Sequence, residues 1–169
     1  MRLCWLRLGR DCELRDEAGN PLASLRHGAH FAVRPKATAT AAGRTFTFRP
    51  ARLKSKGKIR SVTELVDDSG LAAFSLTGEN LDGRAQARVT FANRQVLRFL
   101  VREVSRETAI MTAVDQNGMR VARYRHTVTG LAQQAEIIVN PQWELTDERS
   151  LAIVISTPWL NRYFASEQL

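Results

Sequence analysis

The stretch Glu148–Leu169, ERSLAIVISTPWLNRYFASEQL, decides the fold. Residues Leu151–Ile155 are apolar without interruption, and a second apolar group follows between Trp159 and Ala165. A helix with this pattern is apolar around most of its circumference and needs burial on all sides. We therefore expect the preceding strands to close into a barrel that this helix fills.

Pro158 leaves two interpretations of this stretch open. Either one helix continues through Pro158 with a kink, or Leu151–Ile155 form a strand and a shorter helix begins with Thr157 as N-cap and Pro158 at its first position. Leu151–Ile155 lack the alternation of a half-exposed strand, which favours the continuous helix. Asp147 then serves as its N-cap, and Glu148 lies in the first turn, where the helix dipole favours an anion.

Three turns of the form D-x-x-G lie between pairs of apolar runs upstream of the helix. They are Asp16–Gly19, Asp67–Gly70 and Asp115–Gly118, and their first residues are 51 and 48 positions apart. An Asp side chain can cap the backbone amides of such a turn, and Gly supplies the positive φ. The spacing suggests one hairpin module used three times, with three unrelated hairpins as the alternative.

The remaining extended segments raise the count to eleven or twelve strands. Thr45–Arg49 and Ala87–Phe91 alternate in polarity, Trp143–Leu145 forms a last short strand, and Ala37–Ala42 is expected to be a loop. Side chains just fill a barrel of eight strands, so enclosing a helix requires more strands.

The sequence therefore predicts a mostly β protein, a closed antiparallel barrel of about 12 strands around a C-terminal hydrophobic α-helix. We assign one domain to residues 1–169, with strands in 1–146 and the central helix in 147–168. A chain of 169 residues is large enough for one well-buried core.

These features resemble the tubby C-terminal-like superfamily, particularly its LURP-one-related and phospholipid-scramblase-like branch. The resemblance rests on the successive D-x-x-G hairpins, the strand Trp143-Glu144-Leu145, Asp147 and the terminal apolar helix. It covers nearly the whole chain and implies a closed antiparallel barrel of about twelve strands around a C-terminal helix.

The resemblance also implies expectations about ligands. Tubby domains bind phosphoinositide head groups through basic residues on the barrel surface, and the counterparts here are the Lys and Arg residues between Arg34 and Arg60. Scramblase-like members bind calcium through an acidic segment near the helix. Asp147 and Glu148 are the only acids close together there, which argues against a calcium site in this chain.

The positive charge of the chain is concentrated in one segment. The net charge is +8, yet the residues from Ala18 to Thr63 carry ten positive charges and no acid, which leaves −2 for the rest. Within RPARLKSKGKIR (49–60), a single extended strand would project five basic residues on one side. With Arg49, they form the candidate anion- and lipid-binding set: Arg49, Arg52, Lys54, Lys56, Lys58 and Arg60.

Such a basic face has three interpretations. At roughly 1 kcal/mol per basic residue near an anionic membrane, five charges supply about 5 kcal/mol. Nucleic acid could use the same face, although no aromatic side chains for base stacking are interleaved with the charges. The third interpretation is a solvated outer face of the barrel with Lys56-Gly57 in a hairpin turn.

Signals for catalysis are absent from the sequence. Cys4 and Cys12 are expected to be reduced structural residues, and His27 and His30 lack the further ligands of a metal site. No phosphate-binding loop, dinucleotide fingerprint, nucleophile elbow or H-E-x-x-H motif is present. We expect a protein that is not an enzyme and that uses no cofactor or metal.

The location expected from the sequence is the cytoplasm, with peripheral membrane contact. The N-terminus has charges where a signal peptide needs an apolar run. The charge-free run Leu151–Asn161 is about half of the roughly 20 residues that a transmembrane helix requires. The expected function is a binding or adaptor module that contacts acidic phospholipid head groups, with nucleic-acid binding as the alternative and the protein partner unknown.

Overall fold

The structure, a computed structural model, describes residues 1–8, 11–27, 37–55, 58–81, 84–104, 108–129 and 132–166. Twelve strands precede one helix, α1 (Asp147–Ser166). The strands are β1 (Arg2–Leu8), β2 (Asp11–Asp16), β3 (Pro21–His27), β4 (Ala37–Ala41), β5 (Arg44–Ser55), β6 (Lys58–Asp67), β7 (Ala72–Leu81), β8 (Arg84–Phe91), β9 (Val96–Val104), β10 (Thr108–Asp115), β11 (Arg120–Thr129) and β12 (Ala132–Val139).

The strands form a closed antiparallel barrel in which each strand pairs with its sequence neighbours. The first and last strands close it, with Arg2 opposite Ile138 and Arg7 opposite Gln133. The N-terminal amine of Met1 donates a hydrogen bond to the carbonyl of Val139 at 3.2 Å. The expected fold class, a mostly β barrel of about 12 strands, is confirmed.

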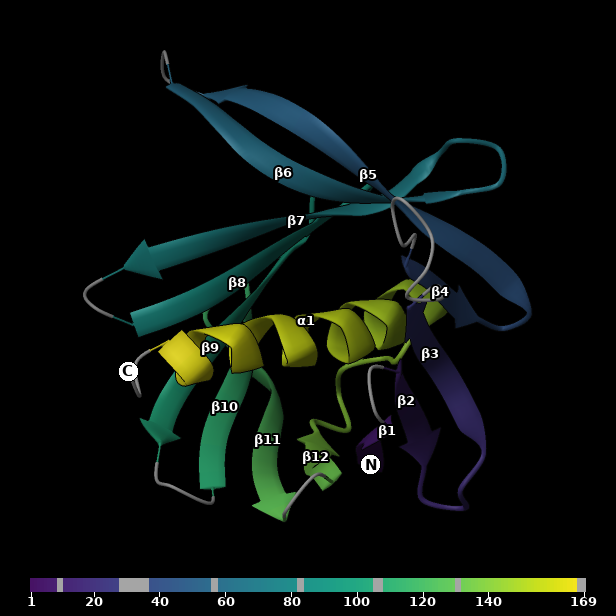
Figure 1. The fold of residues 1–169 in the computed structure, drawn as a ribbon, viewed down its shortest axis with the longest axis vertical. Helices are drawn as coiled ribbons and strands as arrows, with labels where there is room; N and C mark the ends of the chain where they lie inside the picture. The colour runs from purple at the N-terminus through teal and green to yellow at the C-terminus, as the bar shows by residue number, and fades with distance from the viewer. Residues whose placement is uncertain are drawn as a thin grey trace.

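Helix α1 lies inside this barrel, with strands on several sides of it (Figure 1). Six successive side chains, from Leu151 to Ser156, are at most 4% exposed. Because six consecutive positions cover every side of a helix, this part of α1 is enclosed all round. Its contacts include β2, β3, β4 and β8. The central helix expected from the apolar pattern is therefore present.

The helix continues through Pro158, so a strand at Leu151–Ile155 is excluded. The expectation that Asp147 is the N-cap is wrong. The hydroxyl of Thr146 accepts a hydrogen bond from the backbone N–H of Arg149 at 3.3 Å, which makes Thr146 the cap. Asp147 and Glu148 instead lie in the first turn, where the helix dipole favours acids.

The three D-x-x-G turns share one geometry. At each, the Asp backbone N–H donates to the carbonyl four residues on, and the Gly N–H donates back to the Asp carbonyl. The glycines have φ values of +88°, +81° and +81°. One Asp carboxylate oxygen accepts from the backbone N–H four residues on, at Asn20, Leu71 and Met119. Gly is required here because other side chains are strained at such φ values.

The register around these turns is also repeated. Each hairpin contains a bulge just before the Asp, between Leu14 and Arg15, Leu65 and Val66, and Ala113 and Val114. The turns join β2 to β3, β6 to β7 and β10 to β11, so one recurs at every fourth strand of a 12-stranded barrel. The shared bonds and bulges favour a repeated module over three unrelated hairpins.

Two local expectations are wrong. Ala37–Ala41 form strand β4, in which Ala39 and Ala41 are buried in the core at 0% and 3% exposure. A two-residue turn at Ala42 and Gly43, both with positive φ, then leads into β5. Conversely, 143–145 form no strand and belong to the connection between β12 and α1.

The barrel interior contains polar atoms without partners, and Tyr124 provides a test. Its side chain is 0% exposed and its ring packs edge-on to Phe99 at 6.0 Å, but its hydroxyl has no hydrogen-bond partner. Burying an unpaired hydroxyl costs about 1 to 3 kcal/mol. We expect Tyr124→Phe, which keeps the ring, to raise the free energy of unfolding by about 1 kcal/mol in urea titrations. A loss of stability would show that the hydroxyl is satisfied in solution.

Candidate anion-binding surfaces

The hairpin of β5 and β6 extends away from the helix, beyond the rest of the barrel (Figure 1). Its two strands pair from Phe46–Asp67 to Ser55–Lys58. The main core cluster includes Phe46 and Leu65 but no described side chain from Arg49 to Val62, although Val62 itself is only 4% exposed. Beyond Val62 the hairpin, which contains most of the predicted binding residues, projects from the barrel (Figure 1).

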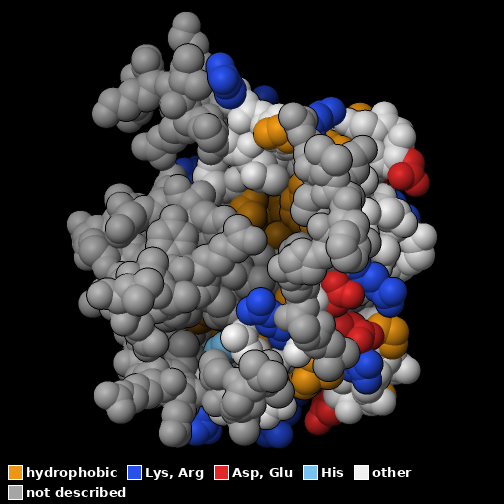
Figure 2. Space-filling model, viewed as in Figure 1, with side chains coloured by type: hydrophobic (Ala, Val, Ile, Leu, Met, Phe, Trp, Pro, Cys, Tyr) orange, Lys and Arg blue, Asp and Glu red, His pale blue; other side chains and the backbone are white. Residues whose placement is uncertain are grey.

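The structure describes the six predicted anion-binding residues to different extents. Side chains are described for Arg49 and Arg52, strand positions alone for Lys54, Lys58 and Arg60, and Lys56 lies outside the described residues. On the face shown in Figure 2, the coloured side chains over the projecting part of the hairpin include basic ones. Arg52 is exposed and forms no ion pair with any described residue.

Arg49 is engaged within the hairpin. Its Nε and Nη2 atoms both donate to Glu64 Oε2, at 3.0 and 2.8 Å. Glu64 lies directly opposite Arg49 in the register, so the pair fastens β5 to β6. An anionic partner would have to compete with this carboxylate, which makes Arg49 a poorer candidate than Arg52.

The expectation that five basic residues share one face is wrong for this hairpin. Residues directly opposite each other in an antiparallel pair lie on the same face. The register pairs Leu53 with Arg60 and Ser55 with Lys58. The positions of Lys58 and Arg60 are therefore on the face opposite to those of Arg52 and Lys54. The error arose because the chain reverses after Ser55, where a single strand was expected.

A second basic surface, which the sequence analysis missed, lies on the outside of β8, β9, β11 and β1. We call it the arginine belt. Its side chains are all exposed, and none has an ion pair or side-chain hydrogen bond to a described residue. Its members are Arg2, Arg88, Arg98, Arg120 and Arg123. They are scattered from position 2 to position 123, so only the barrel register brings them together.

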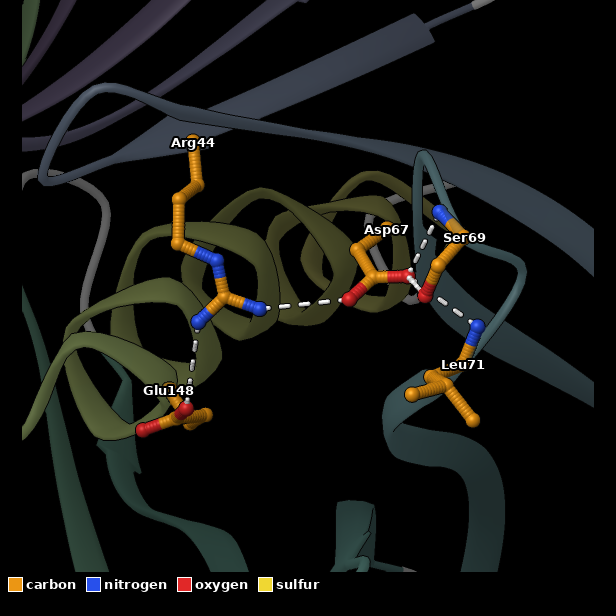
Figure 3. Close-up of polar contacts among 5 residues, drawn as sticks. All are labelled: Arg44, Asp67, Ser69, Leu71 and Glu148. Carbon is orange, nitrogen blue, oxygen red and sulfur yellow. Dashed lines mark hydrogen bonds and ion pairs between the residues drawn. The ribbon is translucent and has the colours of Figure 1, made fainter.

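Arg44 fastens the barrel end near the start of the helix (Figure 3). One of its guanidinium nitrogens lies 3.2 Å from Asp67, the other lies 3.8 Å from Glu148, and the guanidinium stacks 5.0 Å from the Phe46 ring centre. Asp67 also accepts a hydrogen bond from Ser69, and these bonds lower the pKa of Asp67. These groups link β5, a D-x-x-G turn and α1, and we assign them a structural role.

Two grooves are lined by described residues of mixed charge. One, of about 420 Å³, borders Arg44 and is lined by further polar side chains including Asn93 and Thr146. The other, of about 590 Å³, lies over β2, β3 and β4 and includes Glu13 and Arg26. Figure 2 shows acidic and basic side chains side by side over β2 and β3. Opposite charges along one groove give no preference for an anion.

Within the described part of the chain, the residues considered for other chemistry form no site. Cys4 and Cys12 are free thiols, and burial raises the pKa of Cys12 to about 12, which makes it a poor nucleophile. His27 ends β3, and His30 lies outside the described residues. Within the described ranges, no three His, Cys, Asp or Glu side chains form a group that could hold a metal ion.

Among the described residues, no helix combines the length and apolarity needed to cross a bilayer. Comparison of the chain with protein-family models, with curated proteins and with solved structures yields no match.

Proposed function

We propose that this protein is a non-enzymatic binding module whose β5–β6 hairpin contacts acidic phospholipid head groups at the cytoplasmic face of a membrane. The observation that supports the proposal is the projecting hairpin with its exposed Arg52, which forms no ion pair with a described residue, in a segment that contains no acid from Ala18 to Thr63. The resemblance to tubby-like domains, which bind phosphoinositides, agrees with this proposal.

The register limits the strength of this contact. Arg52 and Lys54 are the basic positions on one face of the hairpin, and at roughly 1 kcal/mol each they supply about 2 kcal/mol to membrane affinity. This is less than half of the 5 kcal/mol expected for a five-charge strand. The protein alone is therefore expected to bind weakly and reversibly, and a membrane-bound partner or several copies would strengthen attachment.

Co-sedimentation with vesicles tests the proposal. We expect the wild-type protein to sediment with phosphatidylcholine vesicles that contain phosphatidylserine, and not with phosphatidylcholine alone, at low salt. The double variant R52Q/K54Q is expected to bind roughly 30-fold more weakly, since 1.4 kcal/mol corresponds to a factor of ten. Circular dichroism of the variant checks that the barrel is intact.

R88Q/R98Q is the matched control, because it removes the same net charge from strands β8 and β9 and leaves the hairpin unchanged. Its binding to the acidic vesicles is expected to equal that of the wild-type protein. Equal recovery of the wild-type protein with neutral and acidic vesicles would contradict the proposal. An equal loss in both double variants would show that net charge, and not the hairpin, governs binding.

A further inference from the structure

The arginine belt contains a pair of like charges that no described acid compensates. Arg88 and Arg98 lie directly opposite each other in the β8–β9 pair, with buried Val89 and Leu97 as the next cross-strand pair. Both arginines therefore point outward, and like charges at this separation destabilise a sheet. Elsewhere on the barrel, by contrast, Arg15 and Arg49 each have an acid at 3.0 Å or less.

The belt continues across the neighbouring strands. Arg98 lies opposite Val114, which in turn lies opposite Arg120. Further along β11, Arg123 lies opposite Ile138 of β12, and Ile138 in turn lies opposite Arg2 of β1. The five arginines thus follow a path around the barrel from β8 to β1.

Among the described side chains, the two acids on these strands, Asp115 and Glu136, form no ion pair with the belt. Asp115 uses its carboxylate within a turn, where it accepts from the backbone N–H groups of Asn117 and Met119. Glu136 lies directly opposite Arg125, which is outside the belt. The five exposed guanidinium groups are therefore available to an external anion.

The curvature of the barrel identifies the kind of anion. Twelve strands close a full circle, so each step from one strand to the next turns the surface by about 30° on average. Five steps separate Arg88 on β8 from Arg2 on β1, or about 150°. A flat membrane cannot contact arginines spread over this arc. A DNA duplex has a persistence length of about 150 base pairs, so bending it around an arc this wide and this short would cost several kcal/mol.

We propose that the arginine belt binds the phosphate backbone of a single-stranded nucleic acid that wraps around the barrel. A single strand is flexible and carries its charges in series, as the belt does. Ile138, which is 51% exposed between Arg123 and Arg2, offers an apolar contact to a sugar or base. No aromatic side chain is fully exposed among the described residues of these strands, so binding depends on phosphates and has little sequence preference.

Fluorescence anisotropy with a labelled oligothymidine of about 30 nucleotides tests this proposal across a salt series. Five phosphate contacts to a single strand predict that the logarithm of the affinity falls with the logarithm of salt with a slope of about −3.5. R88Q/R98Q is expected to make this slope shallower by about 1.4. Loss of these two phosphate contacts is also expected to weaken oligonucleotide binding by about tenfold to a hundredfold at about 50 mM salt.

R52Q/K54Q is the matched control here, because it removes the same charge from the hairpin and leaves the belt intact. It is expected to retain wild-type affinity and slope for the oligonucleotide. R88K/R98K, which keeps both charges, is expected to restore most of the affinity that R88Q/R98Q loses. Thermal unfolding of each variant confirms that it is folded.

Four results would overturn the proposal. The first is unchanged oligonucleotide affinity and slope in R88Q/R98Q, and the second is an equal loss in R52Q/K54Q. The third is tighter binding of a duplex of the same length. The fourth is loss of acidic-vesicle binding in R88Q/R98Q without any oligonucleotide binding. The hairpin and the belt are tested with different variants and ligands, so failure of one proposal leaves the other standing.

Discussion

Ile153→Asp is expected to unfold the protein. Ile153 is 0% exposed in the middle of the enclosed part of α1, and Val154 and Ala152 beside it are equally buried. A carboxylate there loses its hydration among side chains that are themselves buried, and the apolar contacts of the isoleucine are lost as well. The expected loss exceeds about 4 kcal/mol, which is comparable to the whole stability of an ordinary domain. Circular dichroism and urea titration of the purified protein measure it.

Ile138→Asp is the matched control for this substitution. Ile138 is 51% exposed on the outer face of β12, so the same chemical change there leaves the new carboxylate in water. We expect a loss of less than about 1 kcal/mol, set by the lower strand propensity of Asp. Similar stabilities for the two variants would contradict a helix enclosed by the barrel.

Acidification is expected to destabilise the barrel through His126. This side chain is 3% exposed, faces the interior from β11, and stacks at 5.6 Å against the ring of Trp5. Burial, together with the nearby positive charge of Arg7, lowers the pKa of His126 from 6.5 to about 4. Because the unfolded chain binds a proton at higher pH than the folded chain does, protonation favours unfolding.

The sign of the effect fixes the pH window. The contribution of neutral His126 to the free energy of unfolding is fully present above pH 6.5. It decreases as the pH falls toward 4 and is lost below the pKa of the folded state. The loss from this one group is roughly 3 kcal/mol. Urea midpoints of the wild-type protein and of His126→Gln, measured between pH 4 and pH 7, test this. The variant is less stable at pH 7 because it loses ring contacts, but its pH dependence is expected to be flatter. Parallel pH profiles would contradict the role of His126.

The sequence was sufficient to predict the architecture because the relevant signals are local. Leu151–Ile155 are apolar at every position, which no surface helix tolerates, and burial of the whole stretch follows from hydrophobicity alone. The D-x-x-G turns carry their own hydrogen-bond acceptors and glycines, so their geometry is set by four or five residues. Ala37–Ala41 were missed because alanine is disfavoured in strands, and burial of Ala39 and Ala41 inside the barrel depends on distant parts of the chain.

The charged surfaces were predicted less well, because they depend on register. A chain reversal between Ser55 and Lys58 was enough to divide the predicted face of the hairpin in two. Arg88 and Arg98 become neighbours only when β8 and β9 pair, and Arg2 joins them only when β1 meets β12. None of these distances is encoded in a motif of the primary sequence.

The closure of the barrel by its first and last strands has a consequence for biosynthesis. Met1 and Val139, joined by a backbone hydrogen bond, are 138 residues apart, and α1 is made after both. On the ribosome, one edge of β1 must therefore stay unpaired until β12 has emerged. Closure of the barrel is thus expected to be slow, and nascent chains of this protein are natural clients for chaperones that shield sheet edges.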